Sequence, residues 1–274
     1  MTTEPATPSS ERNDIRPLTG VPFESIFEAF AEGFSDYVVP LQPSIDALRE
    51  MLTRRGFVPS VSVGAFEGSR LVGFVLNCLD GNRAYNSGTA TLPTHRRRGL
   101  SRELMLASFE LLRGKTYMLE VLEQNPGAIA LYESVGFTRT RRLQVWAFSP
   151  QSPTRITELA NADLDEIRSW CDVAPSWQND VPAIRRARDS YVVLGTTDAA
   201  AVVFPRTGDL PLLAVRPSAR LGGLGRQLLA AAGTRANKAL RIMNVDDGDE
   251  GIAAFLKRCE ATRGPAQFEM TLQL

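Results

Sequence analysis

The first half of the chain contains the segment ATLPTHRRRGLSREL at residues 90–104. Its order predicts a strand, a glycine-containing turn and an amphipathic helix that begins near Gly99. Free N–H groups and the positive dipole end of such a helix favour a phosphate, and glycine allows the backbone to approach the phosphate oxygens closely. Arginines beside this end add charge-assisted hydrogen bonds. The segment therefore predicts an anion-binding turn.

The second half repeats this pattern in the segment LAVRPSARLGGLGRQL at residues 213–228. Proline, arginine and glycine keep one spacing between the two copies, at positions 93 and 217, 96 and 220, and 99 and 223. A single copy is compatible with a plain turn that carries solvated arginines. Two copies in register instead indicate an internal duplication in which both turns have the same function.

The segment SPQSPT at residues 149–154 divides the chain nearly in half. Two prolines and small polar residues oppose both helix and strand pairing, so we expect a linker there. The sequence then predicts a flexible tail at residues 1–14, one domain at 15–148 and a second at 155–274. Each half is long enough to bury its own core.

Composition narrows the classes of function. The 31 basic and 31 acidic residues balance, which argues against a dedicated binder of nucleic acid or of anionic membranes. Three widely spaced cysteines and one histidine predict neither disulfides nor a metal site. No signal-peptide pattern or membrane-spanning run is present, so the expected location is the cytoplasm.

Hydrophobic periodicity and turn residues predict a mixed α/β layout for the first half. The expected helices lie around residues 22–33, 44–54 and 99–113, with a short one from Pro126. The expected strands lie at residues 61–66, 71–76, 88–92, 117–122 and 141–148.

A second motif, LEVLEQNPGAIALYESVGF, occupies residues 119–137. Asn125 before a proline is typical of a helix start, and Gly136 fits a helix end. Tyr132 follows Asn125 by about two turns, so both fall on one side of this short helix. Neither a Walker A pattern nor a GxGxxG fingerprint accompanies these motifs, which disfavours nucleotide hydrolysis and dinucleotide binding.

Together the two motifs resemble those of the GNAT acyltransferase family, in which R/Q-x-x-G-x-G/A is followed by N-x-x-A-x-x-x-Y-x-x-x-G-F. The matching positions are Arg96, Gly99 and Ser101 in the loop, and Asn125, Ala128, Tyr132, Gly136 and Phe137 in the helix. Ser101 replaces the usual glycine or alanine. The resemblance implies two tandem domains, each a mixed, mostly antiparallel sheet flanked by helices.

The same resemblance implies that acetyl-CoA is the acyl donor and that no metal takes part. The residues expected to bind it are Ala90, Thr91 and Leu92 beside the pantetheine arm, Arg96, Arg97, Arg98, Gly99, Leu100 and Ser101 at the pyrophosphate, and Asn125. Tyr132 is the expected proton donor to the departing thiolate. A half-buried packing aromatic is the alternative role.

Acyl transfer to an amine also needs a general base, which the motifs do not single out. Glu120 is the first candidate, with Asp36 and Glu123 behind it. Each is equally compatible with a solvated charge.

The second half matches only part of the pattern found in the first half. Its loop supplies candidate cofactor-binding residues Arg220, Gly222, Gly223 and Gly225. Phe255 is expected where Tyr132 stands in the first half, and phenylalanine donates no proton. The sequence therefore predicts a degenerate second domain. The segment APSWQN at residues 174–179 contains a tryptophan that either closes a cleft or packs the domains together.

The leading hypothesis is an N-acetyltransferase that moves an acetyl group by direct attack of a primary amine. The acceptor is a small amine or the N-terminus of a peptide or protein. A CoA-binding sensor without catalysis and an acyltransferase with another donor, such as aminoacyl-tRNA, are the alternatives. Neutral charge and paired phosphate loops argue against the tRNA donor.

Overall fold

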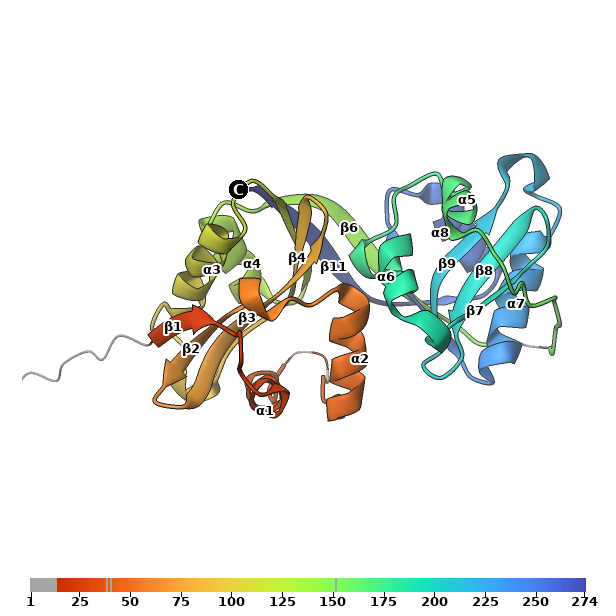
Figure 1. Ribbon diagram of the computed structural model, residues 1–274. Helices are drawn as coiled ribbons and strands as arrows, with labels where there is room; N and C mark the ends of the chain where they lie inside the picture. Colours follow the sequence, from red (N-terminus) through yellow and green to blue (C-terminus); the bar gives the residue numbers. More distant parts are fainter. Residues whose placement is uncertain (1–13, 38, 40, 151) are drawn as a thin grey trace, which may run out of the picture.

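The computed structural model describes residues 14–37, 39, 41–150 and 152–274. Most of the predicted tail and residue 151 of the predicted linker lie outside the described residues. Two lobes lie side by side, and one β-sheet runs through both of them (Figure 1). Within the described ranges, no helix is long and apolar enough to cross a membrane.

Local sequence sets the limits of the helices in the first half. Ser44 accepts the N–H of Ala47 at 3.2 Å and starts α2, and Gly56 ends it at a φ of 85°. In chain order the first half contains β1 (Asp14–Pro17), α1 (Phe23–Gly33), α2 (Ile45–Arg55), β2 (Val63–Glu67), β3 (Arg70–Asp80), β4 (Arg83–Thr91), α3 (Leu100–Leu111), β5 (Thr116–Leu122), α4 (Pro126–Ser134) and β6 (Thr138–Phe148).

The second half repeats the strand, turn and helix of the first. Gly99 and Gly223 stand at the starts of α3 and α7 with φ of 82° and 87°, and Arg97 and Leu221 both have a φ of 67°. The second half contains α5 (Leu164–Ser169), α6 (Val181–Arg186), β7 (Val192–Gly195), β8 (Ala199–Phe204), β9 (Asp209–Val215), α7 (Leu224–Ala236), β10 (Leu240–Asp246), α8 (Glu250–Arg258) and β11 (Thr262–Gln273).

Helices cover both faces of the sheet in the first half. Phe74 of β3 stacks on Phe30 of α1 with ring centroids 6.1 Å apart. The preceding residue, Gly73, faces the opposite way, because a Cβ there would meet Leu104 of α3 at 3.1 Å. β3 therefore reads as a nearly continuous apolar run, since both of its faces are buried.

The two halves exchange their last strands. The strand order across the sheet is β1-β2-β3-β4-β5-β11-β6-β10-β9-β8-β7. β11 comes from the second half but lies between β5 and β6, antiparallel to both. β6 comes from the first half and pairs with β10 of the second. Figure 1 shows the C-terminus ending over the first half.

The predicted mixed α/β fold with a mostly antiparallel sheet is confirmed, but the structure differs from a sheet for each half. Because β6 and β11 cross between the lobes, the two expected sheets are joined into one of eleven strands. Every strand edge at the junction is thereby paired.

One strand pair in each half diverges. β4 and β5 run parallel and pair only from Arg83↔Thr116 to Asn86↔Leu119. At that point Ser87 is an extra residue in β4 relative to β3, a β-bulge that bends the strand away. In the second half, β9 and β10 pair only at Asp209↔Arg241. Each half therefore has an opening beside the N-terminus of its long helix.

Candidate active site

The anion-binding turn of the first half encloses a cavity of about 300 Å³. It is lined by loop residues 95–97 and 99–102, together with Thr91 and Leu131. Arg97 and Arg98 are exposed, so their charges are available to an anion. Ala90 and Thr91 at the end of β4 and the following Leu92 are buried, and the Thr91 hydroxyl contacts that of Ser101 at 2.9 Å.

Arg96 has a structural partner that its sequence position did not reveal. Its guanidinium donates to both carboxylate oxygens of Asp36, at 2.6 and 2.8 Å. It also donates to the carbonyls of Gly33 and Thr91, both at 3.0 Å. The side chain therefore ties the end of α1 to β4.

The second half repeats this arrangement around a larger cavity of about 520 Å³. Arg220 donates to Asp172 at 2.7 Å and to the carbonyl of Trp170 at 2.8 Å. Gly222, Gly223 and Gly225 belong to the loop, but Leu221 and Gly222 replace the arginines at 97 and 98. Gly225 and Phe255 both line this cavity and lie close together, since a Cβ added at Gly225 would be 3.2 Å from the Phe255 ring. The second loop thus carries less positive charge.

Helix α4 places Asn125 and Tyr132 as its sequence predicts. The Asn125 Oδ1 accepts the N–H of Ala128 at 3.1 Å and starts the helix. Tyr132 is buried against Phe137, with ring centroids 5.9 Å apart. Burial raises the pKa of the Tyr132 phenol to about 12, while a hydrogen bond with Thr89 opposes the rise. The phenol therefore keeps its proton at neutral pH.

The position equivalent to Tyr132 in the second half is Leu256, and the expectation of Phe255 was wrong. Asp249 starts α8 by accepting the N–H of Ile252 at 3.0 Å, as Asn125 starts α4. The seventh residue after this start is Leu256, which is fully buried. The second half consequently has no hydroxyl at this position. The residue that starts each helix, and not the nearest aromatic residue, decides which positions of α4 and α8 correspond.

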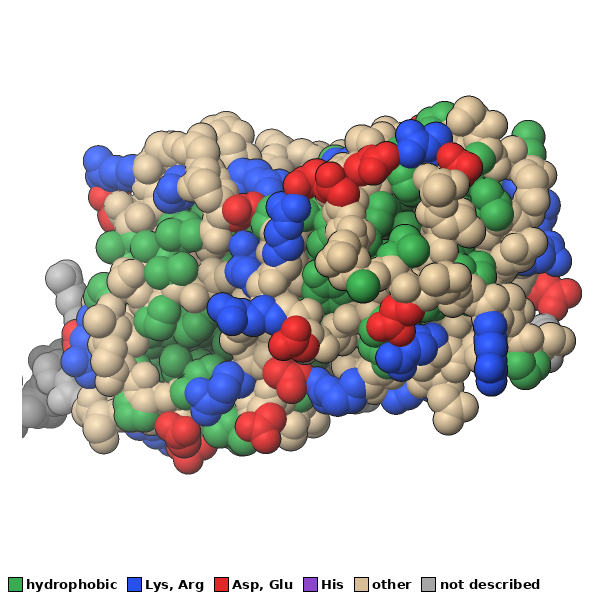
Figure 2. Space-filling view, turned by 45° about the vertical axis from the view of Figure 1, so that its right-hand side comes forward, with side chains coloured by type: hydrophobic (Ala, Val, Ile, Leu, Met, Phe, Trp, Pro, Cys, Tyr) green, Lys and Arg blue, Asp and Glu red, His purple; other side chains and the backbone are tan. Residues whose placement is uncertain are grey.

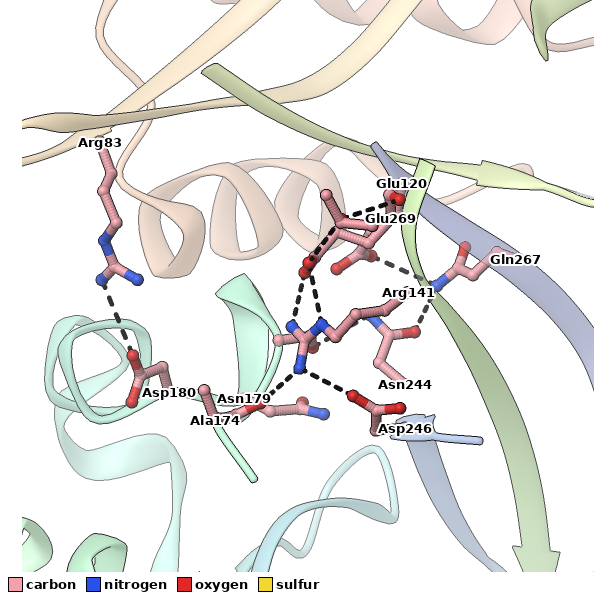
Figure 3. A network of polar contacts seen from close by, with 12 residues as sticks. Arg83, Glu120, Arg141, Ala174, Asn179, Asp180, Asn244, Asp246, Gln267 and Glu269 are labelled. Carbon is pink, nitrogen blue, oxygen red and sulfur yellow. Dashed lines mark hydrogen bonds and ion pairs between the residues drawn. The ribbon is translucent and has the colours of Figure 1, made fainter. Parts of the chain in front are cut away.

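Glu120 lies on β5 with its carboxylate in the seam between the halves (Figure 3). The residue as a whole is half-buried, but Oε1 is buried and has no hydrogen-bond partner. Oε2 accepts from Gln267 of β11 at 3.3 Å. Burial raises the pKa of the Glu120 carboxyl, and the nearby Arg55 charge opposes the rise. A base with a raised pKa suits proton removal near neutral pH.

The two other candidate bases lie in surface ion pairs. Asp36 contacts Arg96, and hydrogen bonding to this guanidinium lowers the pKa of Asp36. Glu123 contacts Arg142 at 2.8 Å, which lowers the pKa of Glu123 in the same way. Carboxylates held in this way are weaker bases than Glu120.

Trp177 of the second half packs into the first half. Its ring stacks on Tyr85 with centroids 5.2 Å apart and planes at 8°, and its indole N–H donates to the Arg55 carbonyl at 2.8 Å. It belongs to a 3-10 turn, Trp177–Asn179, whose residues are all buried. The tryptophan thus packs the halves together at the Glu120 side of the first half.

Charged residues from both halves surround this seam (Figure 3). Arg141 of β6 donates to both oxygens of Glu269 in β11, at 2.9 and 2.6 Å, and to Asp246 of β10 at 3.3 Å. Gln267 also contacts Asn244. On the face drawn in Figure 2, basic and acidic side chains are interspersed and lie between apolar patches.

Sequence reasoning missed Arg55, Asn244 and Gln267 as neighbours of Glu120. They come from α2, β10 and β11 and share no spacing with the motif around Glu120. Gln178 lies in the segment that was singled out for its tryptophan, but nothing local marked the glutamine itself. The strand exchange places Gln267 beside Glu120, whereas Arg55 comes from α2 of the same half as Glu120.

Comparisons with known proteins agree with this fold. A family model described as the acetyltransferase (GNAT) family matches residues 23–137. The N-alpha-acetyltransferase RimI of Mycobacterium tuberculosis is 36% identical over 81 residues, which cover 28% of this chain and 51% of that protein. The chain thus spans about half the length of this curated relative.

Two solved structures share the fold over nearly the whole chain. A putative acetyltransferase from Pyrococcus horikoshii has a TM-score of 0.72 at 16% identity, covering 95% of this chain and 89% of that one. A tandem GNAT protein from the clavulanic acid biosynthesis pathway has a TM-score of 0.66 at 16% identity, covering 96% and 98%. Residues 23–137 therefore resemble the GNAT acetyltransferase family, and the whole chain shares the fold of a tandem GNAT protein.

Proposed function

We propose that this protein is an N-acetyltransferase in which acetyl-CoA donates an acetyl group to a primary amine in the first half of the chain. The observation that carries the proposal is the buried, protonated phenol of Tyr132 on the helix that follows the anion-binding turn. Arg97, Arg98 and the start of α3 would hold the phosphates of the donor. Asn125 lies at the start of the Tyr132 helix, next to the opening.

In the proposed reaction, the amine nitrogen forms a bond with the acetyl carbonyl carbon while the carbon–sulfur bond breaks. Glu120 accepts the proton that the amine loses, and Tyr132 donates a proton to the departing thiolate. The products are an amide and free CoA. The two side chains suit these roles because burial favours the neutral phenol and raises the basicity of the carboxylate.

The second half supports a different role. Leu256 offers no proton, yet the cavity beside its loop is larger than that of the first half. We propose that this half binds a ligand, without transfer, and that it serves mainly to complete the first half. Three free cysteines agree with a reducing cytoplasm as the place of action.

The test is a titration with acetyl-CoA followed by an assay of thiol release with a panel of primary amines and short peptides. We expect binding and release of one thiol for each amide formed. Binding with no release on any acceptor would favour the sensor alternative, and no binding would contradict the choice of donor. Glutamate in place of Arg97 and Arg98 should weaken donor binding, because it places like charge beside the phosphates.

The pH profile tests Glu120. Activity should fall as the pH drops through the raised pKa of this carboxyl, and Glu120→Gln should lower kcat by about 10²- to 10⁴-fold and abolish that limb of the profile. Glu123→Gln is the matched control on the same segment and should leave kcat unchanged, because that carboxylate pairs with Arg142 on the surface. A Glu123 variant that loses activity while the Glu120 variant keeps it would reverse the assignment.

Through Glu120, the free energy of unfolding should change with pH in the opposite direction to activity. Because the folded-state pKa of this carboxyl is raised, the folded protein holds the proton more tightly than the unfolded chain. Its contribution to the free energy of unfolding is therefore lost as the pH rises from the ordinary pKa of a glutamate through the raised value. Glu120→Gln should remove this loss, so thermal melts at neutral pH should show an increased Tm.

A further inference from the structure

Two buried polar atoms of complementary character lie unpartnered in the seam between the halves. Glu120 Oε1 is a hydrogen-bond acceptor, and Gln178 Nε2 is a donor. Native proteins leave few such atoms without a partner, because each costs about 1–3 kcal/mol. Among the described residues only four buried side-chain atoms lack a partner, and three of them, on Arg54, Glu120 and Gln178, belong to this seam.

Arg55 connects the surroundings of the two atoms. Its guanidinium donates to Gln178 Oε1 at 2.7 Å, which leaves the Gln178 amide nitrogen as the free end. It also donates to Ser87 Oγ at 3.1 Å, at the bulge where β4 leaves β5. The same guanidinium lies over Tyr85 at 5.9 Å, and its charge acts on the Glu120 carboxyl. Both Glu120 and Gln178 therefore lie near the Arg55 guanidinium, close to the point where β4 leaves β5.

Hydrogen bonds and ring stacking hold residues 177–179, which include Gln178, in place. The Arg54 guanidinium donates to the Gln178 carbonyl at 2.8 Å, and the Asn179 amide donates to the Met243 carbonyl at 2.7 Å. Trp177 is held by its stacking on Tyr85 and by its hydrogen bond to Arg55. Exchange of β6 and β11 prevents the halves from separating as rigid bodies, because that movement would break the central strand pairs. Access therefore depends on side-chain movement, which favours a small ligand over a polypeptide chain.

We infer that the acceptor is a small molecule with a primary amine next to a carboxylate, as in a free amino acid. The amine lies on Glu120 Oε1, and the carboxylate accepts from Gln178 Nε2 and faces the Arg55 charge. Gln178, supplied by the second half, is then a specificity-determining residue of the reaction in the first half. This inference rests on the proposed function and narrows the class of its acceptor.

The test compares three matched acceptors with acetyl-CoA as donor: free amino acids, the corresponding decarboxylated amines, and tetrapeptides with the same first residue. Thiol release gives kcat and KM for each. We expect the amino acids to have the highest kcat/KM. Gln178→Ala should raise their KM by about 10- to 100-fold, the effect of losing a hydrogen bond to a charged group, with kcat nearly unchanged. The KM of the decarboxylated amines should not change.

Gln178→Glu keeps the size of the side chain and places a negative charge before the carboxylate. It should raise the KM for amino acids further and shift the preference toward decarboxylated amines, an effect that a purely structural role does not produce. Gln227→Ala on the exposed face of α7 is the matched control and should leave every constant unchanged. Thermal melts and acetyl-CoA titrations of each variant establish folding and donor binding.

The outcomes separate the two levels of the proposal. Tetrapeptides that react as well as or better than amino acids, or a Gln178→Ala variant with the parent KM, would overturn the inference and leave the transferase intact. A lack of transfer to all three classes, with acetyl-CoA bound, would contradict the proposed function itself. Selective transfer to amino acids that is lost in Gln178→Glu would establish both.

Discussion

Tyr132→Phe is expected to lower kcat by about 10²- to 10⁴-fold while the affinity for acetyl-CoA stays nearly unchanged. The substitution removes only the hydroxyl, so packing against Phe137 is retained. The departing thiolate then leaves without a proton from the protein. Because burial raises the pKa of Tyr132 to about 12, its loss should lower the rate evenly across neutral pH. Steady-state kinetics and donor titration measure the two quantities separately.

Tyr117→Phe is the matched control for this substitution. Tyr117 is also fully buried, but its hydroxyl donates to Asn77 Oδ1 within the core. Removing it leaves a buried acceptor without its donor and should lower the free energy of unfolding by about 1–3 kcal/mol with kcat preserved. A Tyr132→Phe variant with parent turnover, or a Tyr117→Phe variant with the larger loss of kcat, would remove Tyr132 from the mechanism.

Separation of the halves is expected to abolish folding altogether. Residues 1–149 expressed alone lack β11, which pairs with β5 along seven residues from Gln267↔Leu122 to Gln273↔Thr116. Met270 of this strand is fully buried in the core of the first half. Residues 154–274 alone likewise lack β6, the partner of β10. Each half would expose an unpaired edge beside a buried core, the condition that promotes aggregation.

Co-expression of the two halves is the matched control. We expect each fragment alone to be insoluble or to lack a cooperative thermal transition, and the pair to assemble into a stable complex that releases thiol. Circular dichroism and size-exclusion chromatography make the distinction. A first half that unfolds cooperatively as a monomer would show that β6 can close its own sheet, and would contradict the need for exchange.

Much of the site was predictable because local hydrogen bonds and backbone conformation decide it. Asn125 starts α4 with its own side chain, and Gly99 accepts a φ of 82° that other residues resist. Each of these requirements calls for a particular residue type at a fixed spacing, so it can be recognised in the sequence. The same logic would have placed Leu256 correctly, because Asp249 starts α8 as Asn125 starts α4. Matching the nearest aromatic instead of the helix start gave the wrong residue.

Other parts of the site could not be recognised from a pattern in the neighbouring sequence. Arg96 is predicted to contact phosphate, and nothing in the sequence indicated that its guanidinium also contacts Asp36, 60 positions earlier in the chain. Glu120 was the first of three candidate carboxylates, but the sequence did not reveal that its carboxylate is buried while Asp36 and Glu123 form surface ion pairs. Ion pairing and burial depend on what the folded chain places nearby, and neighbouring residues in sequence do not report it.

The sequence by itself determined the duplicated strand, turn and helix, the two glycine-led helix starts, and the tyrosine present in only one half. Local conformation and helix capping account for all of these. Only the tertiary structure decided that β11 completes the first half and that Gln267 reaches Glu120. The physical reason is that strand pairing uses main-chain N–H and C=O groups that every residue carries, so the sequence does not state which strand will be the neighbour.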